Sequence, residues 1–206
     1  MEKKNYNERE YILNGSVQMR SLDASAGDNP DSRIVCGYAA RFDTESQNIG
    51  WIEKIHAGAI TEDTIMNSDI FARLNHDENT VLARSRYGEG SLALELRDDG
   101  LYYEFEAPHT AAGDELLEHL KRGEITTSSF AFSLPEDGTG QRWYRDGEVL
   151  RRDITKIDRL YDVSPVYEPA YLDTSCNKRN MQIVDKSTKI NSMYDSMYEE
   201  LEKFKI

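Results

Sequence analysis

Short runs of alternating apolar and polar residues dominate this sequence, and this pattern is typical of half-buried β-strands. Residues 92–96 and 101–105 alternate around a turn that contains Asp-Gly, which predicts a β-hairpin. Similar runs predict further strands at residues 11–20, 33–42, 70–74, 124–134 and 141–144, and between Ile154 and Val163. Loops rich in Gly, Pro and Asp separate them.

Two internal helices are predicted. Residues 61–66 begin with a capping threonine and acidic residues, and residues 110–122 combine a leucine stripe with basic residues just before Gly123. Many short strands with few helices predict an α+β protein that is mainly β, an antiparallel β-barrel with peripheral helices.

The chain changes character at Asn177, so we predict a domain at residues 1–176 and a tail at residues 177–206. Apolar residues in the tail recur at helical spacing and predict a C-terminal amphipathic helix. A stripe of this kind can pack on the domain or bind a partner, and the sequence favours neither. Its members are Ile190, Met193, Tyr194, Met197, Tyr198, Leu201 and Phe204.

Composition limits the possible partners. The 206 residues include 25 Lys and Arg against 38 Asp and Glu, a formal net charge of -13, which repels nucleic acid and anionic membranes. No apolar run is long enough to span a bilayer, and no export signal precedes the first strand. The two cysteines have no metal-type or disulfide-type spacing, which favours an intracellular protein.

The strand after Gly123 contains the candidate nucleophile. Alternation places Phe130 and Phe132 on one face, while Ser129, Ala131 and Ser133 lie on the other. A serine on a rigid strand between small residues is suited to nucleophilic attack if a base lies nearby. The alternative is that such a hydroxyl only satisfies neighbouring backbone groups or water.

His76 and Asp162 complete the residue types that serine acyl transfer requires, a base and a carboxylate that orients it. Their spacing along the chain does not show that they converge on Ser129. Asp77 and Glu78 beside His76 raise the possibility of a metal site, but no second histidine lies at ligand spacing. We therefore expect no metal and no cofactor.

The ordered set of motifs resembles the prohead maturation protease family of tailed phages, which is distantly similar to herpesvirus assemblin. The set comprises Asn75-His76-Asp77, a Leu-rich helix ending in Arg-Gly, the strand from Ser128 to Phe132, and Asp162-Val163-Ser164 before Pro-Ala-Tyr. The resemblance spans roughly residues 10–176 and implies an assemblin-like barrel. It also implies that His76 is the general base, Ser129 the nucleophile and Asp162 the third member, with Ser128 the less favoured serine.

Three residues depart from the family pattern. Thr127 and Ala131 stand where glycine is frequent, and Asp162 stands where glutamate is common. A carboxylate with a reference pKa of about 4 is ionised at neutral pH with either side-chain length, so the last change is chemically mild.

The resemblance further implies a serine endopeptidase that cleaves phage scaffold and capsid proteins, and its own tail, inside the assembling prohead in the cytoplasm of the bacterial host. It implies a homo-oligomer, while the acidic composition leads us to expect binding to neither nucleic acid nor membrane. The alternative is a noncatalytic factor that uses the same fold to bind scaffold or capsid subunits during assembly.

Overall fold

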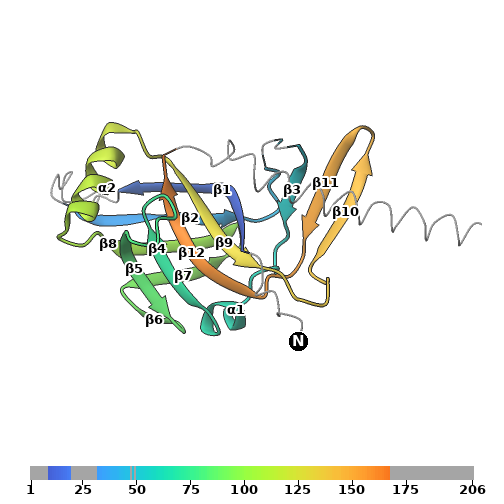
Figure 1. Ribbon diagram of the computed structural model, residues 1–206, viewed down its shortest axis with the longest axis horizontal. Coiled ribbons are helices and arrows are strands. Elements are labelled where there is room, and N and C mark those ends of the chain that lie inside the picture. Colours follow the sequence, from blue (N-terminus) through green and yellow to red (C-terminus); the bar gives the residue numbers. More distant parts are fainter. Residues whose placement is uncertain (1–8, 20–31, 47, 49, 168–206) are drawn as a thin grey trace, which may run out of the picture. The chain divides into compact units, whose positions relative to one another are not determined.

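A computed structural model describes residues 9–19, 32–46, 48 and 50–167 (Figure 1). All of them belong to the first of the two units into which the chain divides, Met1–Pro169. The predicted C-terminal helix and the tail at residues 177–206 lie outside the described residues.

The described part of the chain is mainly β, as predicted. Its strands are β1 (Glu10–Met19), β2 (Ile34–Arg41), β3 (Ile52–Ile55), β4 (Asp69–Arg73), β5 (Val81–Arg86), β6 (Glu89–Gly90), β7 (Leu92–Arg97), β8 (Gly100–Glu106), β9 (Thr127–Ser133), β10 (Gln141–Asp146), β11 (Val149–Ile154) and β12 (Arg159–Val166), and its helices are α1 (Glu62–Met66) and α2 (Ala111–Arg122).

Nine strands form one curved sheet in the order β6-β5-β4-β12-β9-β1-β2-β8-β7, and a smaller sheet has the order β10-β11-β3 (Figure 1). The two ends of the large sheet approach each other, since the backbone N–H of Arg84 in β5 donates to the hydroxyl of Ser91 beside β7 at 3.2 Å. The sheet is therefore a nearly closed barrel. The predicted wholly antiparallel pairing is wrong, because β4 runs parallel to β12 and β3 runs parallel to β11.

Local sequence signals placed both helices correctly. Thr61 caps α1, where its hydroxyl accepts the backbone N–H of Thr64, and Thr110 caps α2 in the same way through Gly113. Gly123 ends α2 with a φ of 69°, a left-handed conformation that glycine adopts without steric cost. The predicted hairpin is formed by β7 and β8.

Strand β9 lies in the middle of the large sheet, paired with β1 on one side and β12 on the other. Phe130 and Phe132 are fully buried in the core, as the alternation predicted. The opposite face is also buried, since Ser129, Ala131 and Ser133 are 2%, 0% and 0% exposed. The sequence did not predict burial of this second face, because alternation within one strand does not show what covers its polar side.

A buried charge cluster links the small sheet to the start of β1. Arg152 in β11 contacts Glu10 at 2.5 Å and Glu53 of β3 at 3.3 Å, and its Nε donates to Gln141 at 2.9 Å. Arg152 and Glu53 are 4% and 3% exposed. Burial raises the pKa of the Glu53 carboxyl, and the charge of Arg152 acts in the opposite direction. Arg152 thus compensates two acidic groups at once.

Replacing Arg152 by Met leaves these carboxylates without their counter-charge. We expect the free energy of unfolding at neutral pH to fall by about 3–5 kcal/mol, as measured by urea denaturation. Arg151→Met is the matched control. Arg151 contacts the more exposed Glu45 and Asp146, so its loss should cost about 1 kcal/mol or less. Equal losses for both variants would contradict a special role for the buried cluster.

Candidate active site

The loop after β4 carries His76 and is shaped by its neighbour Asp77. The Asp77 carboxylate accepts hydrogen bonds from the backbone and side chain of Asn79 and from the hydroxyl of Thr80. The bond from the Asn79 backbone, followed by that from Thr80, lowers the pKa of Asp77. Asp77 therefore organises the loop.

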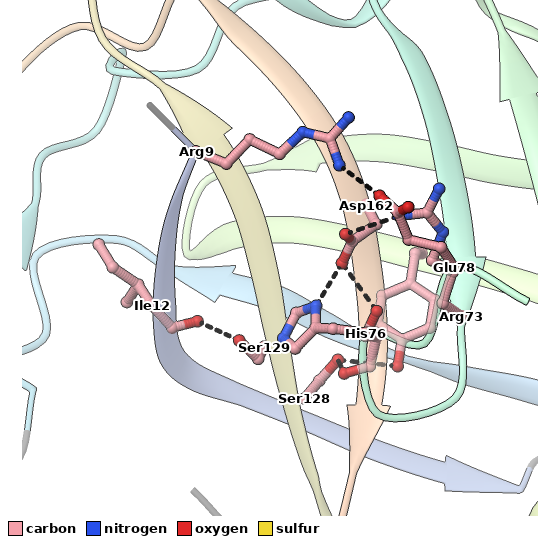
Figure 2. Close-up of polar contacts among 10 residues, drawn as sticks. Arg9, Ile12, Arg73, His76, Glu78, Ser128, Ser129 and Asp162 are labelled. Atoms are coloured by element: carbon pink, nitrogen blue, oxygen red, sulfur yellow. Dashed lines mark hydrogen bonds and ion pairs between the residues drawn. The ribbon is translucent and has the colours of Figure 1, made fainter. Parts of the chain in front are cut away.

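Two consecutive residues of this loop have left-handed backbones, Asn75 with a φ of 54° and His76 with a φ of 60°. Such angles are uncommon outside glycine, although Asn and His adopt them more often than most residues. The Asn75 backbone N–H donates to the carbonyl of Pro165 at 2.9 Å, which ties the loop to β12. This turn directs His76 towards the middle of the large sheet (Figure 2).

His76 and Asp162 are in direct contact. Nδ1 of His76 lies 2.6 Å from Oδ1 of Asp162, and the two side chains are 13% and 1% exposed (Figure 2). The parallel pairing of β4 with β12, which matches Phe71 with Asp162, brings the end of β4 alongside the carboxylate. With Nδ1 engaged, Nε2 is the nitrogen that can accept a proton, as catalysis by a histidine base requires.

Ser129 lies on the same face of the sheet as Asp162. Ser129 is the register partner of Ser164, whose hydroxyl donates to Oδ1 of Asp162 at 2.7 Å. On the other side of β9, the ring of Tyr11 packs edge-on against His76 with centroids 4.7 Å apart, and Tyr11 is the register partner of Ala131. Directly opposed residues of antiparallel strands share a face. The imidazole therefore lies over the face that carries Ser129.

The Ser129 hydroxyl is not bonded to His76 in this structure. It donates to the carbonyl of Ile12 in β1 at 3.0 Å, while His76 Nε2 has no hydrogen-bond partner (Figure 2). Catalytic hydrogen bonds are often absent without substrate and form in the bound complex. Rotation about the Cα–Cβ bond of Ser129 changes the direction of its hydroxyl without moving the strand.

Ser128 has a different environment from Ser129. It is 0% exposed, its hydroxyl donates to the carbonyl of Ser164 at 3.1 Å, and it lies 3.0 Å from the hydroxyl of Tyr103. Burial raises the pKa of Tyr103, so its hydroxyl is a neutral hydrogen-bonding group. Ser128 therefore belongs to a buried polar network on the core side of β9.

Unsatisfied polar atoms gather at this site. Among the described residues, buried side-chain nitrogen and oxygen atoms without a hydrogen-bond partner occur only at Arg73 Nε, His76 Nε2 and Asp162 Oδ2. Folded proteins pair most buried polar atoms, and exceptions are expected at functional sites. The same described ranges contain no group of three His, Cys, Asp or Glu side chains that could hold a metal ion.

Sequence reasoning singled out His76, Ser129 and Asp162, but it missed three neighbours: Tyr11, Arg73 and Ser164. Ser164 had a usable signal, since it lies two residues after Asp162 and therefore on the same strand face. Arg73 and Tyr11 had no such signal, because their positions depend on pairing between distant strands.

A buried Asp-His pair on the face that carries a strand serine, within a mainly β barrel-like sheet, defines a candidate serine hydrolase. The family model described as Caudovirus prohead serine protease matches residues 17–187, and the chain belongs to this family. It is thus a serine peptidase of phage capsid maturation, as its motifs indicated.

Among solved structures, the chain is similar to the bacteriophage T4 capsid assembly protease gp21. The two have 11% sequence identity and a TM-score of 0.47, with 79% of this chain and 100% of that chain covered. No curated protein matches the sequence significantly. No helix in the described ranges is long and apolar enough to cross a membrane.

Replacing Ser128 by Ala tests the separation of the two serines. We expect proteolysis to continue, because Ser128 faces the core and away from His76. The free energy of unfolding should fall by about 1–3 kcal/mol, since the buried Tyr103 hydroxyl loses its partner. Denaturation and cleavage of the cognate capsid protein measure the two effects. An inactive but stable Ser128→Ala protein would show that the wrong serine has been assigned as nucleophile.

Proposed function

We propose that this chain is a Ser-His-Asp endopeptidase in which Ser129 is the nucleophile, His76 the general base and Asp162 the group that orients His76. The observation that carries the proposal is the 2.6 Å contact between His76 and buried Asp162, on the face of the sheet that carries Ser129. The family of the chain, a serine protease family, supports the same reaction class.

The residues suit the steps of peptide hydrolysis. Ser129 Oγ attacks the scissile carbonyl carbon while His76 Nε2 accepts its proton, and the imidazolium then donates this proton to the leaving amine. A water molecule releases the acyl group from Ser129 by the reverse sequence. Asp162 accepts a hydrogen bond from the Nδ1–H group throughout, which holds the productive tautomer and stabilises the imidazolium.

The proposed substrates are the scaffold and major capsid proteins of a tailed phage. Their cleavage would take place inside the prohead, in the cytoplasm of the bacterial host, with the protease acting as a homo-oligomer. The name of the family supports action in the prohead.

Replacing Ser129 by Ala should abolish proteolysis, with a loss on the order of 10⁶ in rate, since no other group can form the acyl intermediate. The fold should be retained, because the change removes one hydroxyl that donates to the Ile12 carbonyl. Cleavage of capsid and scaffold proteins and labelling by a serine-directed fluorophosphonate measure the loss, with Ser128→Ala as the matched control. Full activity of Ser129→Ala would refute the assignment, and absence of labelling in the wild type under assembly conditions would favour a noncatalytic assembly factor.

The proposal extends to the tail at residues 177–206, which we take to be a docking segment that the protease removes from itself. The family match ends at residue 187, before the apolar stripe that begins at Ile190. Seven large apolar side chains can each contribute about 1.5–3 kcal/mol when buried against a partner, before ordering costs are subtracted.

Intact-mass measurement tests the removal of the tail. We expect trimming between about residues 177 and 190 in the wild type and none in Ser129→Ala, and the untrimmed variant should bind scaffold more tightly than a tail-deleted chain. An active enzyme that stays untrimmed, and that unfolds when the tail is deleted, would show that the tail belongs to the core.

A further inference from the structure

We propose that Arg73 is a positioning residue that supplies the counter-charge of the buried Asp162 carboxylate and so supports His76, an inference that rests on the function proposed above. The side chain of Arg73 in β4 is 10% exposed, and its Nη1 lies 3.6 Å from Oδ2 of Asp162 (Figure 2). This separation is an ion pair and is longer than a hydrogen bond. Arg73 is the group that faces the carboxylate oxygen turned away from His76.

The two oxygens of Asp162 have different partners. Oδ1 accepts the hydrogen bonds from His76 and Ser164, at 2.6 and 2.7 Å. Oδ2 has no hydrogen bond and only the ion pair with Arg73. A buried carboxylate is costly unless it is paired, so without the guanidinium a proton on Oδ2 becomes the simplest way to remove the charge. A protonated Asp162 no longer stabilises the imidazolium of His76.

The other charges around the pair largely balance each other. Glu78 lies 3.1 Å from Arg9, the residue before β1, and 3.9 Å from Arg73, and its side chain is 70% exposed. Asp77 is occupied by the hydrogen bonds of its own loop. The neighbouring strands add Tyr11 from β1 and Tyr161 from β12, which lies under Arg9, and β9 adds the neutral Ser129. Arg73 is therefore the near counter-charge of Asp162.

Phe71 provides a matched comparison within the structure. The guanidinium of Arg73 lies over its ring at 4.7 Å, and that of Arg84 in β5 lies over the same ring at 4.6 Å. Arg84 forms its hydrogen bonds with Asp69. The two arginines thus share an aromatic contact but pair with different carboxylates, and only Arg73 faces the candidate active site.

The test measures the rate of fluorophosphonate labelling of the full chain between acid and alkaline pH. This reaction forms the bond from Ser129 Oγ to phosphorus, expels fluoride and needs His76 to accept the proton. In Arg73→Gln, loss of the positive charge 3.6 Å from Asp162 Oδ2 makes protonation of the Asp162–His76 pair easier, so the acid limb of the profile should move to higher pH by about one unit. Labelling should therefore be about tenfold slower on the acid side and close to that of the wild type at alkaline pH.

Three variants serve as controls. Arg84→Gln should keep the wild-type profile, although it loses the same ring contact. Ser164→Ala removes a hydrogen bond to Asp162 without removing charge, so it should lower the rate at every pH with little movement of the limb. Arg73→Lys keeps the positive charge but places it on a different side chain, so its acid limb should lie between those of the wild type and Arg73→Gln. If Arg73→Gln does not fold, Arg73→Lys is the variant that tests the proposal.

The role of Arg73 would be overturned if the acid limb of its folded variants stays at the wild-type pH. It would also be overturned if their labelling rate falls by the same factor at all pH values. Ser129→Ala separates this result from failure of the proposed function. If Ser129→Ala is labelled like the wild type, the assignment of the nucleophile is wrong. If labelling requires Ser129 while the Arg73 variants keep the wild-type profile, only the inference about Arg73 fails.

Discussion

The structure of the site depends on one buried carboxylate, that of Asp162. Its side chain is 1% exposed, and a charge at such a position must be compensated from several directions. Three elements supply this compensation: the loop after β4 through His76, β4 itself through Arg73, and β12 through Ser164. The imidazole of His76 is held in its orientation because its Nδ1 atom supplies one of the hydrogen bonds that the buried Asp162 carboxylate requires.

The mixed pairing of the large sheet makes this arrangement possible. Because β4 runs parallel to β12, the chain leaves β4 at the level of the sheet where the later residues of β12 lie, and the Asn75 hydrogen bond to Pro165 fixes the turn there. Antiparallel pairing of β12 with β9 then sets Ser164 opposite Ser129. A shift of one residue in β9 would turn Ser129 towards the core and Ser128 towards His76.

Local patterns predicted much of the fold, and the ordered set of motifs named the three candidate residues, whereas pairing between distant strands determined the remaining features. Alternation identified β9 and the hairpin of β7 and β8, and Gly123 marked the end of α2, because each signal lies within a few residues. The parallel pair, the buried serine face of β9 and the contact of Arg73 with Asp162 depend on strands far apart in sequence. The role of Ser129 was suggested by the order of motifs, since spacing alone did not bring it near His76.

The order of strands in the large sheet determines when the site can form during synthesis of the chain. β1, near the start of the chain, pairs with β9, which in turn pairs with β12. A nascent chain that has not yet reached Asp162 lacks both the carboxylate and the strand that completes the pairing of β9. Contacts between such distant segments form late in folding. The topology therefore delays assembly of the site until β12 has left the ribosome, so a shorter nascent chain holds Ser129 and His76 without the carboxylate of Asp162.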